Sequence, residues 1–130
     1  MFSYLKIKYV LLYSEIKIIL KMTKYNLLSV SKLKTGKKKY KAVVFNTETQ
    51  RENSILFGQK GYGDYPQYVK ELGVEEANKK KSAYIARHSK AGEDWTASGV
   101  DTAGFWSYHL LWSETTVEKA LAKIKRKYFS

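Results

Sequence analysis

Two short runs in the middle of the chain are dominated by β-branched and aromatic residues. They are YKAVVFN (residues 40–46) and NSILFGQ (residues 53–59), and the polar stretch TETQRE separates them. Such side chains favour strands, and a polar connection between two such runs is typical of antiparallel neighbours. The pattern predicts a β-hairpin.

A helix is predicted for residues 74–88. Ala77, Tyr84, Ile85 and His88 are spaced to share one face of that helix, whereas the three lysines at 79–81 stay solvated.

A second helix is predicted for residues 101–112, with Asp101 or Thr102 as its cap. Its apolar residues are Ala103, Phe105, Trp106, Leu110, Leu111 and Trp112. Because little of its circumference is polar, we expect it to be the central core helix.

A last helix is predicted to begin at the stretch TTVE (residues 115–118) and to end near Tyr128. The hydroxyl of Thr115 and the carboxylate of Glu118 match the capping box. Val117, Leu121 and Ile124 would form the buried edge of this helix.

Residues 1–21 allow two interpretations. Apolar residues from Leu5 to Ile19 recur at steps of four and three, which predicts an amphipathic helix, although residues 5–9 also alternate as a strand would. We favour the helix, placed on a membrane surface or against a protein partner. Charges interrupt the apolar runs, so neither a membrane span nor a signal peptide is expected, and Met22 offers an alternative start.

Residues 29–41, SVSKLKTGKKKYK, are polar and lack sustained periodicity, which predicts a flexible basic linker. The predicted fold class is therefore α+β, with a small β-hairpin followed by three to four helices and a basic amino-terminal amphipathic helical arm. We place the arm and linker at residues 1–37 and a compact α+β domain at residues 38–130.

Charge is distributed unevenly along the chain. The net charge is +12, and residues 1–41 hold eleven lysines against one acidic residue, Glu15. Such asymmetry indicates contact with a polyanion. The chain has no cysteine, which excludes disulfides and thiolate metal sites.

Basic side chains in the arm, the linker and the last helix are the expected contacts to a partner or polyanion. They are Lys6, Lys17, Lys21, Lys32, Lys34, Lys37, Lys38, Lys39, Lys123, Lys125, Arg126 and Lys127. Lysine contacts to phosphate supply affinity but little sequence information.

The stretch FGQKGYGDYPQY (residues 57–68) is rich in glycine and tyrosine. Its spacing fits neither phosphate-loop motif, and Asp64 would repel an anion. We expect a joint in which Asp64 caps a helical turn begun by Pro66. Tyr62 and Tyr65 stay candidates for stacking on nucleic-acid bases.

Acidic residues and histidines offer a weaker alternative. Glu93 and Asp94, with His88 and His109, could bind a divalent cation as a nuclease would need. We favour a structural role for these residues, with an ion pair from Arg87 to Glu93 or Asp94. No metal or cofactor is expected.

The order of several short motifs resembles an uncharacterised family of small proteins encoded by large double-stranded DNA viruses of algae and amoebae. The motifs are Tyr40 to Phe45, Ile55 to Gly58, Gly61 to Tyr65, Tyr84 to His88, Glu93 to Trp95, Thr102 to Gly104 and Leu111-Trp112. The resemblance covers roughly residues 38–128 and implies a viral setting, but it transfers no catalytic residue.

The resemblance leads us to expect a non-enzymatic virion structural protein, a minor capsid or cement component located in the virion. Its partners would be capsid proteins, with an anionic membrane surface or nucleic acid as further contacts and no small-molecule substrate. A nonspecific nucleic-acid-binding protein is the alternative hypothesis, and a small metal-dependent nuclease is the third.

Overall fold

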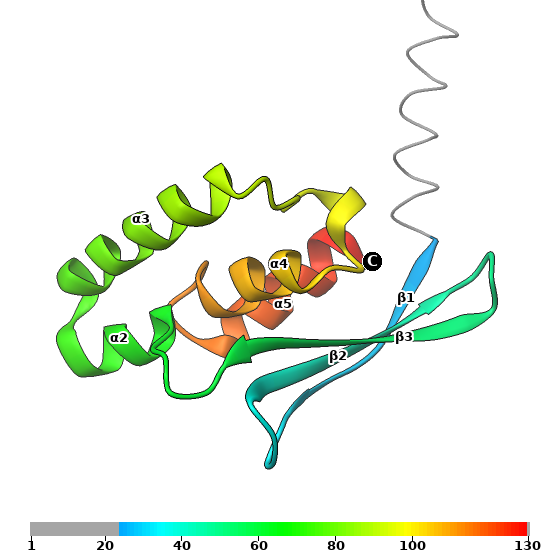
Figure 1. Cartoon of the computed structure of the whole chain (residues 1–130), viewed down its shortest axis with the longest axis horizontal. Coiled ribbons are helices and arrows are strands. Elements are labelled where there is room, and N and C mark those ends of the chain that lie inside the picture. The colour runs from blue at the N-terminus through cyan, green and yellow to red at the C-terminus, as the bar shows by residue number, and fades with distance from the viewer. Residues whose placement is uncertain (1–23, 130) are drawn as a thin grey trace, which may run out of the picture.

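A computed structural model describes residues 24–129 of the chain (Figure 1). The expected helix over residues 1–21 and the candidate contacts Lys6, Lys17 and Lys21 lie outside these residues. The described part contains a sheet followed by helices, so the expected α+β class is confirmed.

The sheet is an antiparallel meander in the order β1-β2-β3. Its strands are β1 (Tyr25–Lys32), β2 (Lys38–Asn46) and β3 (Arg51–Gln59). The predicted hairpin is β2 and β3, which pair from Lys38 opposite Gln59 to Asn46 opposite Arg51.

The first strand was not expected, and the prediction of a flexible linker over residues 29–41 is wrong. Residues 25–32 pair with β2, and residues 38–41 begin β2 itself. A bulge explains why no alternation is visible in β1. Leu27 lies opposite Val44 but Ser29 lies opposite Val43, so Leu28 is an extra residue. The bulge places Leu27 and Val30 opposite Val44 and Ala42, two residues of the buried face of β2.

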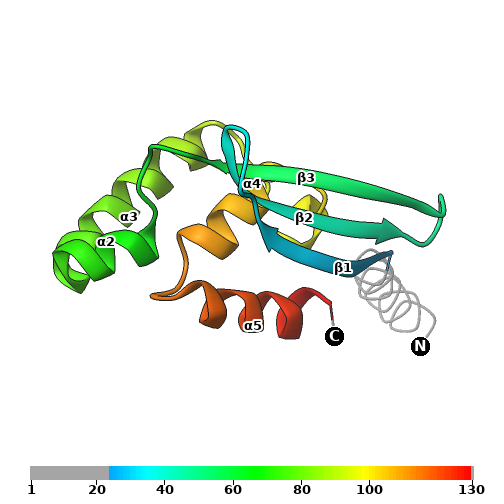
Figure 2. The same cartoon turned by 90° about the horizontal axis from the view of Figure 1, so that it is seen from below.

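The helical part follows β3. It consists of α2 (Tyr65–Leu72), α3 (Val74–Lys90), a 3₁₀ turn η1 (Ala97–Gly99), α4 (Ala103–Trp106), a π-helical turn η2 (Ser107–Leu111) and α5 (Val117–Tyr128). Figures 1 and 2 show α4 and α5 over one face of the sheet, whereas α2 and α3 lie beyond the end at which β3 finishes.

The core lies between the sheet and the segment from α4 to η2. Phe105, Trp106 and Leu110 are fully buried, as expected for the central helix. Trp106 lies 5.9 Å from Phe57 of β3, measured between ring centroids, and its indole nitrogen donates a hydrogen bond to the carbonyl of Val100 at 2.9 Å. The buried indole is thus both packed and hydrogen-bonded, which is the arrangement that tryptophan needs inside a protein.

The cap predicted for the central helix is observed, whereas the cap predicted for the last helix is not. Thr102 caps α4. At α5 the cap is Thr116, whose hydroxyl accepts a hydrogen bond from the Lys119 amide at 3.2 Å. The capping box predicted for Thr115 and Glu118 is therefore wrong, because the helix begins one residue later than that box requires.

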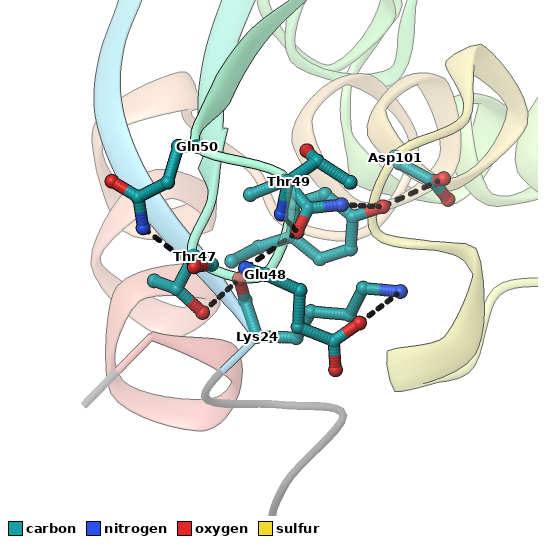
Figure 3. A network of polar contacts seen from close by, with 8 residues as sticks. Lys24, Thr47, Glu48, Thr49, Gln50 and Asp101 are labelled. Carbon is teal, nitrogen blue, oxygen red and sulfur yellow. Dashed lines mark hydrogen bonds and ion pairs between the residues drawn. The ribbon is translucent and has the colours of Figure 1, made fainter.

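A polar network surrounds the β2–β3 turn, at the end of the sheet where β3 begins (Figure 3). Asn46 is buried, and its side-chain oxygen accepts hydrogen bonds from the amides of Glu48 at 3.0 Å and Thr49 at 3.2 Å. Tyr25 donates its hydroxyl hydrogen to Asp101 at 3.1 Å, which connects β1 to the segment before α4. Burial, followed by the charge of Asp101, raises the pKa of the Tyr25 phenol.

No helix within residues 24–129 is long and apolar enough to cross a membrane.

Candidate functional site

The β1–β2 turn and the glycine-rich loop after β3 lie side by side. The Lys60 amide donates a hydrogen bond to the Lys37 carbonyl at 2.9 Å, and the Leu33 amide donates to the Lys39 carbonyl at 2.7 Å. This pairing gathers six lysines at one end of the sheet, which we call the basic end. They are Lys32, Lys34, Lys37, Lys38, Lys39 and Lys60.

Only one lysine of the basic end has a carboxylate partner within the described residues. The Lys39 ammonium lies 2.9 Å from Asp64, and both side chains are about 15% exposed or less. The other five lysines form no ion pair in this part of the chain. The basic end therefore carries a net positive charge that faces solvent.

The two candidate tyrosines have different environments. Tyr62 is 68% exposed and sits in the glycine-rich loop of the basic end. Tyr65 is buried, and its hydroxyl donates to the Asn78 side chain at 2.6 Å. Tyr62 is available for stacking on a ligand, whereas Tyr65 packs inside the protein.

The basic residues of α5 do not join the basic end. Lys123 pairs with Glu114 at 3.0 Å, and Lys125 and Arg126 line a shallow depression beside Asn26 and Leu27. Asn26 and Leu27 lie near the start of β1, whereas Lys32 ends it. At about 3.3 Å per residue the two basic regions are separated by roughly 20 Å along the strand.

The glycine-rich loop is the joint that its sequence predicts. Asp64 caps α2 by accepting a hydrogen bond from the Gln67 amide at 3.0 Å, and Pro66 occupies the first turn. Gly63 is packed so closely that a methyl group there would overlap the ring of Tyr68. Gly63 thus permits close packing, and the carboxylate of Asp64 is turned to the cap and to Lys39.

The residues of the nuclease hypothesis are engaged in structural contacts. Glu93 accepts hydrogen bonds from Trp95 at 3.1 Å and lies 2.5 Å from Nδ1 of His88. The expected ion pair from Arg87 to Glu93 is not formed, because Glu93 contacts His88 instead. Within residues 24–129 no three side chains of metal-ligating type are grouped to hold an ion.

His109 is held by a different contact. Its Nε2 lies 2.6 Å from the carbonyl oxygen of Trp95, and because a carbonyl can only accept, Nε2 carries the hydrogen. Burial, assisted by the charges of Lys127 and Lys123, lowers the pKa of His109, although the hydrogen bond to Trp95 opposes this shift.

A cleft of about 470 Å³ lies next to the basic end, between the glycine-rich loop and α3. Lys80, Tyr84 and Arg87 of α3 line one side of it, and Lys38 lines it from β2. Sequence reasoning missed this cleft, although the steps of four and three residues in α3 place its three side chains on one face of the helix.

No protein-family model matches the chain, and neither a curated protein nor a solved structure is significantly similar to it. The resemblance of residues 38–128 to a family of viral proteins therefore stays a prediction.

Proposed function

We propose that this protein binds nucleic acid without sequence preference and that the basic end is its contact surface. The observation that carries the proposal is the grouping of six lysines at the end of the sheet where the ring of Tyr62 is exposed, with Asp64 as the one carboxylate paired to them within the described residues. Lysines neutralise phosphates of the backbone, and an exposed aromatic ring can stack on any base.

The shape of the basic end favours a single strand as the ligand. Its six lysines lie in β1, in β2 and in the turn and loop that follow these strands, and none lies on a described helix that could enter a major groove. Stacking on Tyr62 needs an unpaired base, which a single strand offers at every position. The net charge of +12 adds long-range attraction toward any such strand.

The test is the affinity for single-stranded DNA as a function of salt concentration, measured by fluorescence anisotropy. Replacing Lys34 and Lys37 together by glutamine should weaken binding and reduce the slope of log K against log salt by about 1.4, since each lost phosphate contact contributes about 0.7. The matched control replaces Lys90 and Lys119, two exposed lysines outside the basic end. Equal losses in the two double variants would reject the basic end as the contact surface.

A second candidate is the virion structural role that the sequence resemblance implies. One observation favours protein docking: the face of the sheet opposite the core carries apolar side chains, with Leu56 49% exposed and Val43 and Phe45 half-buried. A capsid protein could cover this face, which would make the protein a minor capsid or cement component. Mass spectrometry of purified virions tests this role, and absence or a few copies per particle would reject it.

A further inference from the structure

The cleft beside α3 has an excess of positive charge. Its lining includes the cations Lys38, Lys39, Lys80 and Arg87, against a single carboxylate, Asp64. Asp64 is already paired with Lys39 at 2.9 Å. Lys38, Lys80 and Arg87 form no ion pair within the described residues, so three cations face the cleft without compensation.

Tyr84 lines this cleft, and its hydroxyl is the unusual polar group among the lining residues. Tyr84 is 6% exposed, and its hydroxyl is buried without a hydrogen-bond partner in the described part of the chain. A buried hydroxyl with no partner is unfavourable and rare in folded proteins, which points to an external acceptor. Burial, followed by the charge of Glu93, raises the pKa of the Tyr84 phenol, so this group keeps its hydrogen and acts as a donor.

The aromatic rings of the cleft already stack on one another. The ring of Tyr84 is stacked at 4.4 Å from Trp112 and at 4.0 Å from His88, measured between centroids. Lys80 lies 5.4 Å from the ring centroid of Tyr68. A ligand therefore gains more from the cations and the hydroxyl than from stacking a base on these rings.

We propose that this cleft binds a phosphate monoester, with Lys38, Lys80 and Arg87 neutralising the dianion and Tyr84 donating its hydroxyl hydrogen to a phosphate oxygen. Arginine and lysine on facing walls can contact different oxygens of one phosphate, and such charge-assisted hydrogen bonds are stronger than neutral ones. The volume of about 470 Å³ is within the range of small-molecule sites.

Two sources could supply this chemistry. One is a small phosphorylated metabolite or nucleotide, and the other is the terminal phosphate of a nucleic-acid strand. The phosphate site does not depend on strand binding by the basic end, although Lys38 belongs to both. Inorganic phosphate as a probe separates the two proposals, because it carries no base and no backbone.

The experiment titrates the full chain with inorganic phosphate and a nucleoside 5′-monophosphate, following tryptophan fluorescence, since Trp112 lines the cleft. A short DNA strand with and without a 5′-phosphate is titrated in parallel. We expect saturable binding of both small probes, which identifies a small-ligand site, or a gain for the 5′-phosphorylated strand, which identifies strand-end recognition. Either result supports the phosphate site.

Three variants make the test specific. Arg87→Gln and Tyr84→Phe should each weaken phosphate binding about tenfold or more, as expected for the loss of one hydrogen bond to a charged group. Lys90→Gln is the matched control, because Lys90 lies in the same last turn of α3 but does not line the cleft. Tyr84→Phe should leave the melting temperature unchanged or raise it, because it removes a hydroxyl that has no partner in the described residues.

Three results would overturn the proposal. The first is no saturable response to any phosphate probe at low salt. The second is an equal loss of affinity in Lys90→Gln and Arg87→Gln, which would indicate diffuse electrostatic attraction. The third is wild-type phosphate affinity in Tyr84→Phe.

Discussion

Lys39 of β2 and Asp64 of the glycine-rich loop form an ion pair at 2.9 Å that joins the sheet to the start of α2. The two side chains are 15% and 14% exposed, so water screens them only in part. Asp64 uses its other oxygen to cap α2 through the Gln67 amide. One carboxylate therefore fixes both the position and the first turn of the helix.

Two substitutions of Asp64 should separate its role as the helix cap from its role as the partner of Lys39. Asp64→Ala removes the cap and leaves the Lys39 ammonium without its partner, and we expect a loss of about 2–4 kcal/mol in the free energy of unfolding. Asp64→Asn keeps a capping side chain and should cost about half as much. Urea denaturation of both variants, with Lys39→Met to complete a double-mutant cycle, measures the pair. Losses below about 0.5 kcal/mol in both variants would contradict this account.

Gly58 and Gly61 offer a matched pair for testing close packing. Both have positive φ, +71° and +90°, so an alanine at either position carries a similar backbone strain. A β-carbon at Gly58 would lie 2.7 Å from Cδ1 of Leu111, whereas nothing lies within 4 Å at Gly61. We expect Gly58→Ala to be about 1–3 kcal/mol less stable than Gly61→Ala in denaturant unfolding. Equal stabilities would show that Leu111 moves aside without cost.

His109 should make the protein less stable in mild acid. Its pKa in the folded protein is lowered, chiefly by burial, so the unfolded chain, with a pKa of about 6.5, binds a proton first as the pH falls. The stabilising contribution is present above about pH 6.5 and is lost as the pH falls toward the folded pKa. The free energy of unfolding should therefore fall between pH 7.5 and 5.5.

The variant His109→Gln isolates this effect, because glutamine keeps an amide donor and does not titrate. Its free energy of unfolding should change less between pH 7.5 and 5.5 than that of the wild type, while His88→Gln reports the contribution of the other histidine. Identical pH slopes in the wild type and His109→Gln would refute the assignment to His109.

Tyr62→Ala should weaken binding of single-stranded DNA by about 1–3 kcal/mol, the usual contribution of one stacked base. The ring is 68% exposed, so the melting temperature should stay unchanged. The salt dependence should also stay unchanged, because the substitution removes no charge. Anisotropy titrations of Tyr62→Ala and of the control Tyr65→Phe measure this, and equal affinity losses in the two variants would remove Tyr62 from the contact surface.

The elements with regular periodicity could be predicted from the sequence. The β2–β3 hairpin, α3, the central segment with Phe105 and Trp106, and α5 are where the pattern placed them. β1 could not be recognised, because the bulge at Leu28 breaks the alternation on which strand prediction depends. A bulge is defined by its partner strand, which a local pattern does not contain.

The candidate site was predictable only in part. The lysines of the β1–β2 turn are adjacent in sequence, so their clustering could be expected. The cleft could not, because it depends on residues from β2 and α3 that are more than 40 positions apart, such as Lys38 and Tyr84. The missing partner of the Tyr84 hydroxyl likewise follows from tertiary packing and has no signature in the sequence.

The number of residues in η2 has a structural consequence, because this segment is a π-helical turn. Because a π turn takes up one more residue than an α turn, deleting any one residue of Ser107–Leu111 could restore an ordinary helix. Each residue of a helix rotates the next by about 100°. Such a deletion would leave the relative orientation of Trp106, which faces the core, and Trp112, which packs on Tyr84, nearly unchanged, whereas an inserted residue would shift it. Relatives of this protein should therefore tolerate the loss of one residue from η2 more readily than the gain of one.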